Sequence, residues 1–230
     1  MTADSLLWCN ATRIHDWSNL ETPLQILSAW IALGLVADAE WVEGANGRTR
    51  KISIPTSKLG DAIRSEPLGR GDRLIVQVGG SKPREWAVTV VLFPKGAGMN
   101  MFNLTVALNN GMRIGSRVSD SFLSLYSPET ADSAFIHADP QWTQLATESY
   151  KPPLVTTPTF AGVFWANYLG PGHLSHFSVP KLQAIQAYRT EWRDDRAMFL
   201  VTAPTLEEVL TPGGEGELKH LTEEFRAAKV

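Results

Sequence analysis

The stretch that decides the fold class is RLIVQVGGSKPREWAVTVVLFPKGAGMNMFNLTVALNN, from Arg73 to Asn110. Three of its segments, 73–80, 85–94 and 101–110, are rich in β-branched and aromatic residues and are separated by Gly, Pro and Asn. This composition predicts three strands, and connections this short favour antiparallel neighbours in a meander. The middle strand alternates imperfectly between apolar and polar residues, so we expect it to be covered on both faces.

Helical signals precede this meander. Thr22-Pro23 is typical of a helix N-cap followed by proline at the first helical position, and apolar residues recur at helical spacing as far as Leu35. We therefore expect a helix over 23–37. The segment 49–56 (TRKISIPT) predicts a short strand that ends at Pro55, and 57–65 (SKLGDAIRS) could add a turn or two of helix.

Downstream, 119–139 predicts a helix or an irregular segment followed by a short strand at 134–137. The segment 139–150 begins with Asp139 and Pro140, which are typical of a helix N-cap and first turn, and predicts a short helix. The three prolines of 151–159 (KPPLVTTPT) predict a crossing loop that could divide two subdomains. The aromatic run 160–169 (FAGVFWANYL) predicts a central strand buried on both faces, which Gly170-Pro171-Gly172 ends before a short helix.

The last fifty residues predict a hairpin and a closing helix. Two strands, LQAIQAYRTEWR and RAMFLVTA, meet at a tight turn at Asp194-Asp195, although a helical start of PKLQAIQAYR is a competing interpretation. The Gly-rich segment 213–216 predicts a flexible lead-in to an amphipathic helix that carries Leu218, Leu221 and Phe225 on one face. We expect a single α+β domain over 1–230: mostly antiparallel sheet, in one or more sheets, with an N-terminal helix and a C-terminal amphipathic helix packed on them.

Composition narrows the function classes. With 43% hydrophobic and 20% charged residues, the 230-residue chain is typical of a soluble globular protein, and no apolar run reaches the ~18 residues of a membrane span. A lone cysteine, Cys9, suits a reducing compartment, and no secretion signal is evident, so we expect a cytoplasmic protein. The net charge of −3 argues against a nucleic-acid binder.

Catalytic motifs are scarce. His173 and His176 lie three residues apart, so on a helix they could share a metal ion with His137, as in a metal-dependent hydrolase. No H-E-x-x-H, C-x-x-C or G-x-S-x-G motif supports that interpretation. We expect a protein that is not an enzyme and needs no cofactor, with the hydrolase, and a non-catalytic scaffold or ligand-binding module, as the alternatives.

The most informative segment is 118–150, which has five acidic residues, five aromatic residues and no Lys or Arg. Acids without compensating cations create a negative potential, and aromatic residues among them can anchor an interface, so the segment suits a partner with a basic groove, such as a nuclease. Alternatively, the aromatic residues belong to the core and the acidic residues only increase the solubility of the protein. The candidate partner-binding residues are Asp120, Tyr126, Glu129, Asp132, Asp139, Trp142 and Glu148.

Four segments also resemble a known group of proteins: PQW at 140–142, FAGVFWANYLG at 160–170, AYRTEWRDDRAMFLVTAPTLEEV at 187–209 and GELKHLTEEF at 216–225. Their layout is similar to that of immunity proteins of bacterial polymorphic toxin systems, particularly the immunity protein 52 group and related type VI secretion immunity proteins. The resemblance implies a non-enzymatic antidote that binds a cognate toxin by direct protein–protein contact. For this group the toxin is expected to be a restriction-endonuclease-like nuclease. The sequence leaves open whether the chain forms a homodimer.

Overall fold

The computed structural model describes residues 5–12, 20–69, 74–80, 86–93, 100–108, 114–138 and 162–230. The chain forms two compact units. The meander unit is Cys9–Ala107, and the C-terminal unit combines Leu108–Val230 with Met1–Trp8. Strand β1 (Ser5–Thr12), which the sequence did not predict, is divided between the two units. Both units combine helices with antiparallel strand pairs, which confirms the predicted α+β class.

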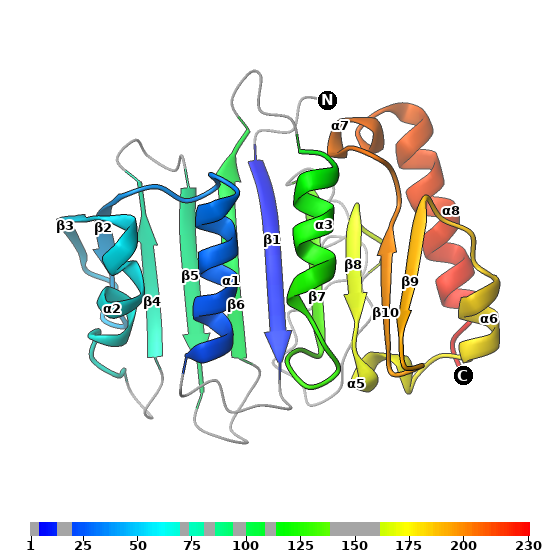
Figure 1. Cartoon of the computed structure of the whole chain (residues 1–230), viewed down its shortest axis with the longest axis horizontal. Coiled ribbons are helices and arrows are strands. Elements are labelled where there is room, and N and C mark those ends of the chain that lie inside the picture. Colours follow the sequence, from blue (N-terminus) through cyan, green and yellow to red (C-terminus); the bar gives the residue numbers. More distant parts are fainter. Residues whose placement is uncertain are drawn as a thin grey trace. The chain divides into compact units, whose positions relative to one another are not determined.

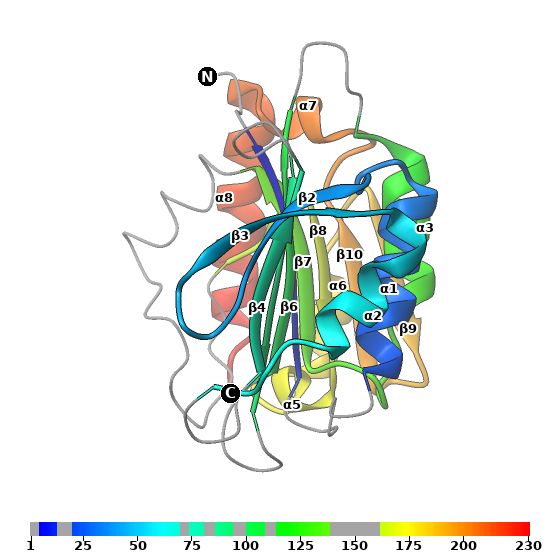
Figure 2. The same cartoon turned by 90° about the vertical axis from the view of Figure 1, so that its left-hand side faces the viewer.

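The meander unit contains an antiparallel row of strands in the order β3-β2-β4-β5-β6. Two helices, α1 and α2, cover the same face of these strands (Figure 2). The elements are α1 (Glu21–Ala32), β2 (Ala39–Glu43), β3 (Thr49–Ile54), the 3₁₀ turn η2 (Thr56–Lys58), α2 (Leu59–Arg64), β4 (Leu74–Gly79), β5 (Trp86–Leu92) and β6 (Asn100–Ala107).

The predicted meander is confirmed, because β4 pairs with β5 and β5 pairs with β6, each antiparallel. The expectation that the middle strand is covered on both faces is wrong. Buried residues of β5 alternate with partly exposed ones, as in a strand with one packed face. The imperfect alternation of the sequence came from Ala87 and Val91, two apolar residues on the less buried face.

Helix α1 begins two residues before the predicted start and ends five residues before the predicted end. It ends early because Gly34 adopts a left-handed backbone with a φ of 75°, which stops the helix. Its buried face includes Ile26, Leu27 and Trp30, and the Trp30 ring stacks on Phe102 of β6 at 4.9 Å between ring centroids. The helix is thus fixed by its apolar stripe against the meander.

The C-terminal unit contains a second antiparallel row in the order β7-β8-β10-β9 (Figure 1). Helices α3 and α8 lie on opposite faces of these strands (Figure 2). The elements are α3 (Ser116–Leu125), β7 (Ser133–Ala138), β8 (Ala166–Leu169), α5 (Pro171–Leu174), α6 (Val179–Ala184), β9 (Arg189–Arg193), β10 (Ala197–Val201), α7 (Leu206–Val209) and α8 (Pro212–Ala227).

Strands β8 and β10 form the centre of this unit. Every residue of both strands is buried, which confirms the prediction of a central strand buried on both faces, although β8 is shorter than the predicted 160–169. The predicted turn and short helix after it are α5. The alternative interpretation of a helical start to 180–189 is confirmed by α6, and the prediction of a strand from Leu182 is wrong before Arg189, where β9 begins.

Helix α8 confirms the predicted closing helix, with Leu218, Leu221 and Phe225 buried. It begins earlier than expected, because the Thr211 hydroxyl accepts a hydrogen bond from the Gly214 N–H at 3.1 Å and caps the first turn. The glycines of 213–216 therefore belong to the helix, and the prediction of a flexible lead-in is wrong.

The predicted helix at 139–150 and the predicted crossing loop at 151–159, with its subdomain break, lie outside the described residues. In the part of the chain that is described, no helix combines the length and the apolar character that a membrane crossing requires.

Candidate functional site

Helix α3 places the first candidate residues. Val118, Phe122 and Leu123 recur at helical spacing and are buried, and the Phe122 ring lies 5.6 Å from that of Trp8 and 6.2 Å from that of Phe199. Packing of this stripe against the strands fixes the rotation of the helix about its axis. The opposite face, which carries Asp120, is therefore directed to solvent.

Tyr126, predicted as an interface anchor, is a core residue. Its side chain is only 4% exposed, and its hydroxyl accepts a hydrogen bond from the Trp8 indole Nε1–H at 2.8 Å. Its ring stacks on Tyr168 of β8 at 5.3 Å. A side chain held in this way contributes to the stability of the C-terminal unit and has no surface to offer a partner.

The other candidates divide into three groups. Asp132 is buried, with 5% exposure, so it is not available at the surface either. Asp120 and Glu129 are exposed, each with 58% of the side chain accessible. The remaining three, Asp139, Trp142 and Glu148, lie outside the described residues and stay predictions from the sequence.

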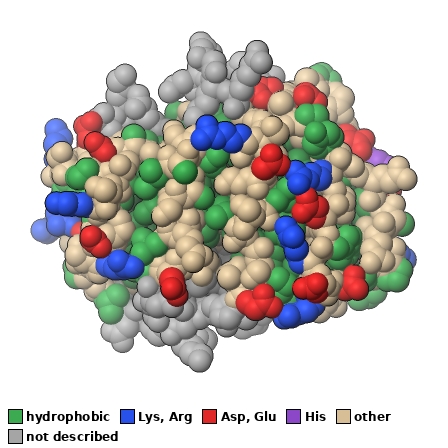
Figure 3. All heavy atoms as spheres, viewed as in Figure 1, with side chains coloured by type: hydrophobic (Ala, Val, Ile, Leu, Met, Phe, Trp, Pro, Cys, Tyr) green, Lys and Arg blue, Asp and Glu red, His purple; other side chains and the backbone are tan. Residues whose placement is uncertain are grey.

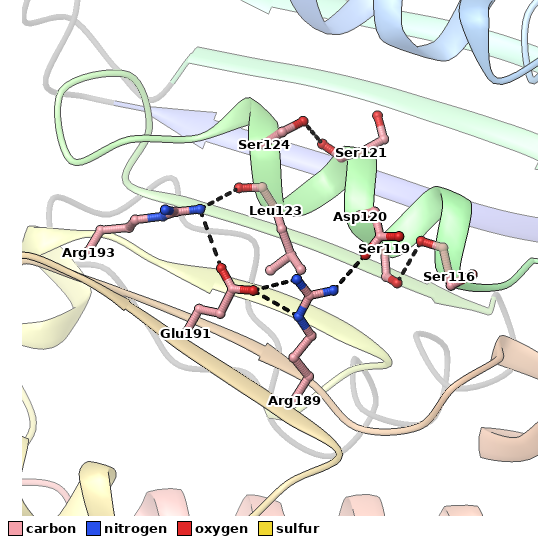
Figure 4. Close-up of polar contacts among 9 residues, drawn as sticks. All are labelled: Ser116, Ser119, Asp120, Ser121, Leu123, Ser124, Arg189, Glu191 and Arg193. Carbon is pink, nitrogen blue, oxygen red and sulfur yellow. Dashed lines mark hydrogen bonds and ion pairs between the residues drawn. The ribbon is translucent and has the colours of Figure 1, made fainter.

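Strand β9 supplies the cation that pairs with Asp120. The Arg189 guanidinium donates to the Asp120 carboxylate at 2.6 Å and forms a second ion pair with Glu191 at 2.5 Å (Figure 4). The carboxylate of Asp120, and to a lesser extent that of Glu191, raises the pKa of Arg189. Arg193 extends the row, because its Nη2 donates to Glu191 and to the Leu123 carbonyl, both at 3.4 Å.

A second pair lies at the turn of the hairpin. Arg196 follows the turn residues Asp194 and Asp195, which both have positive φ, and its guanidinium donates to Glu129 at 2.9 Å. Hydrogen bonds from the Ser127 hydroxyl and from the backbone, together with Arg196, hold the pKa of Glu129 below its usual value. Glu129 therefore stays charged at neutral pH.

These six side chains form what we call the arginine–carboxylate surface. Negative and positive groups alternate along it, and Figure 3 shows both signs over the same part of the molecule, so the prediction of an uncompensated negative region is wrong for Asp120 and Glu129. The compensating cations come from a hairpin about seventy positions further along the chain. The surface consists of Asp120, Glu129, Arg189, Glu191, Arg193 and Arg196.

The pairs of this surface contribute little to folding. Because their side chains are 29% to 59% exposed, solvent and salt screen them, and each exposed pair is worth only about 0–1 kcal/mol. They also orient the side chains, because Arg189 and Arg193 bond to residues of α3 and Arg196 bonds to Glu129 in the turn that follows α3. The charged groups of the surface are thus held in a defined arrangement.

The three arginines were not among the predicted site residues, although the sequence contains a pattern that indicates two of them. Arg189, Glu191 and Arg193 alternate with Thr190 and Trp192, and side chains two apart in a strand lie on the same face. Once this segment is assigned to a strand, its charges form a row. What no local pattern showed is that α3 lies beside that row.

The three histidines of the hydrolase alternative do not form a metal site. Within the described ranges, no group of three or more His, Cys, Asp or Glu side chains is placed to hold a metal ion. His137 is fully buried, its ring lies beside the stacked rings of Phe135 and Phe164, and burial lowers its pKa to about 4. His173 is buried in α5, while His176 is only partly buried.

Comparisons with known proteins match the chain to solved structures and to no family model or curated protein. A solved structure described as Pseudomonas aeruginosa T6SS protein PA0821 matches with a TM-score of 0.59 and 13% sequence identity. The match covers 96% of this chain and 74% of that protein. At this identity the likeness shows a shared fold.

Proposed function

We propose that this chain is an immunity protein of a type VI secretion system, which binds and neutralises a cognate antibacterial toxin. The observation that carries the proposal is the match to a T6SS protein, which extends over 96% of the chain and so includes both units. The resemblance of 135–230 to immunity proteins of polymorphic toxin systems, drawn from separate sequence features, supports the same assignment.

In this proposal the toxin contacts the arginine–carboxylate surface. Asp120 and Glu129, two of the acids predicted to face a partner, belong to it and are exposed. Since each acid has an arginine beside it, the surface suits a partner that presents charges of both signs at matching positions. Such complementarity contributes to specificity and to the rate of association more than to affinity.

The toxin itself is expected to be a nuclease of the restriction-endonuclease-like class. That expectation comes from the resemblance to the immunity protein 52 group. A nuclease also needs a basic groove for its nucleic-acid substrate, which the carboxylates of this surface could engage. Inhibition then requires contact alone and no chemistry by the immunity protein.

The experiment is a co-expression test. The C-terminal domain encoded by the adjacent open reading frame is produced in a heterologous host with and without this chain, and survivors and intact DNA are measured. We expect toxicity without the chain, survival with it, and a complex that co-purifies. Persistent toxicity, or no complex with a toxic neighbour, would refute the proposal.

A matched pair of variants tests the surface. Arg196→Glu places two like charges together at Glu129, and Arg226→Glu does the same at Glu223 on α8. Both arginines are exposed and each pairs with one glutamate, but only Arg196 belongs to the arginine–carboxylate surface. We expect Arg196→Glu to slow association with the toxin at least tenfold and Arg226→Glu to leave it unchanged. Equal rates for both variants would place the contact elsewhere.

A further inference from the structure

Strand β9 lies at the end of the strand row in the C-terminal unit. It pairs with β10 on one side, and among the described strands of this unit none pairs with its other side (Figure 1). An edge strand presents unpaired N–H and C=O groups, so it is a template for another strand. Proteins commonly protect such edges with proline, a bulge or charged side chains; β9 contains no proline, and its three charged residues, Arg189, Glu191 and Arg193, alternate in sign.

The segment Tyr188-Arg-Thr-Glu-Trp192 is complementary to itself when a second copy runs antiparallel to it. If Thr190 faces Thr190 of the second copy, Arg189 faces Glu191 and Tyr188 faces Trp192. These are aromatic, opposite-charge and threonine pairs, which are the cross-strand pairs that stabilise antiparallel sheets. The two-fold axis produces each of the outer pairs twice.

The side chains that make these pairs are accessible. Tyr188 is 58% exposed, which is unusual for a large aromatic side chain in this structure. The side chains of Arg189 and Glu191 are 41% and 29% exposed, and Thr190 and Trp192 are partly exposed. Arg189 and Glu191 already form an ion pair within one chain. Two such pairs would meet across the axis as a four-membered charge cluster.

Neighbouring registers are less favourable. An axis at Glu191 places Glu191 opposite itself and Arg189 opposite Arg193, so every charged pair repels. An axis at Trp192 would need Asp194 and Asp195 in the strand, but both have positive φ and form the hairpin turn. Only the axis at Thr190 combines attractive pairs with residues that are extended or directly precede the strand.

We propose that the chain forms a homodimer in which β9 of two copies pair antiparallel about an axis at Thr190. The occupant of the edge is therefore a second copy of this chain, and the contact is isologous, with the same patch on both subunits. A five-residue pairing buries less area than a standard interface, so we expect a dimer that dissociates on dilution. This assembly does not depend on the identity or existence of a toxin.

Cysteine variants of the full chain test the register. In a Cys9→Ser background, Thr190→Cys places two thiols opposite each other at the axis, within reach of a disulfide, whereas Glu191→Cys and Trp192→Cys each face a different residue. We expect rapid oxidative cross-linking of Thr190→Cys alone. Preferred cross-linking through 191 or 192 would overturn the register, and no cross-linking by any of the three would overturn the dimer.

Charge variants test the pairing without cross-linking. Arg189→Glu and Glu191→Arg each replace an attractive pair by a repulsive one, so we expect both to sediment as monomers at concentrations where the unmodified chain is dimeric. Mixing the two variants restores opposite charges across the axis and should restore a dimer. Asp120→Asn removes a partner of Arg189 within the chain and nothing across the axis, so it should remain dimeric. A monomeric unmodified chain, or a mixture that stays monomeric, would refute the proposal.

Discussion

Replacing Gly214 by alanine should destabilise the C-terminal unit, although alanine is normally the better helix residue. Gly214 lies in the first turn of α8, where that helix passes closest to α7. A Cβ atom at this position would lie 2.6 Å from the Val209 Cα and 2.8 Å from the Val209 carbonyl oxygen, and closer still to the carbonyl oxygen of Glu208. Ordinary contacts of a Cβ begin near 3.4 Å.

The expected change in the free energy of unfolding is the sum of two opposing contributions, helix propensity and steric overlap. Alanine in place of glycine favours a helix by about 1 kcal/mol, and less in the first turn. Inserting a methyl group into a closely packed contact costs about 1–3 kcal/mol, and the atoms here are backbone atoms that cannot move aside without shifting α7. The net expectation is a loss of roughly 1–2 kcal/mol. The Thr211 cap is kept, because alanine retains the N–H that donates to it.

Gly216→Ala is the matched control, two residues further along the same helix. No atom lies within 4 Å of a Cβ at this position, so only the helix term applies and a gain of about 0.5–1 kcal/mol is expected. Urea denaturation followed by circular dichroism measures both variants against the unmodified chain. If Gly214→Ala is as stable as Gly216→Ala, the close approach of α7 and α8 does not exist as described.

Three further outcomes are expected. Tyr126→Phe removes the acceptor of the buried Trp8 indole N–H and should lower the free energy of unfolding by about 1–3 kcal/mol; a change below 0.5 kcal/mol would contradict the hydrogen bond. Burial lowers the pKa of His137 to about 4. As the pH falls below 6.5, His137 therefore binds a proton in the unfolded chain but not in the folded chain. Stability should therefore fall by up to roughly 3 kcal/mol between pH 6.5 and 4, and His137→Phe should flatten that part of the profile. Arg196→Ala should leave the urea midpoint nearly unchanged, because its pair with Glu129 is exposed, while slowing toxin association; a large loss of stability would show that the pair is structural.

Local patterns were enough to predict the elements that pack against their neighbours in sequence. The meander β4-β5-β6 follows from three apolar runs with short connections, and α8 follows from a stripe of three apolar residues. Strand β1 was missed because its partners are remote: Trp8 bonds to Tyr126, and Asn10 donates to the Phe102 carbonyl. No window of a few residues contains that information.

The candidate surface could be predicted only in part, for the same physical reason. Charge was counted along 118–150, where Asp120 and Glu129 have no cation nearby in sequence. In the folded chain, each has an arginine within hydrogen-bonding distance. Likewise, Tyr126 looked like an anchor because its segment is acidic, while the residues that bury it include Trp8 of β1 and Tyr168 of β8 as well as Phe122 of α3. Burial and neutralisation depend on long-range contacts.

The division of β1 between the two units has a consequence for synthesis on the ribosome. Trp8 is made early, but the hydroxyl that it bonds belongs to a residue 118 positions later. The meander unit, Cys9–Ala107, is complete before that residue is made, so it can collapse while the N-terminal residues still lack their native neighbours. An emerging chain therefore exposes the apolar segment around Trp8 at least until α3 has been translated.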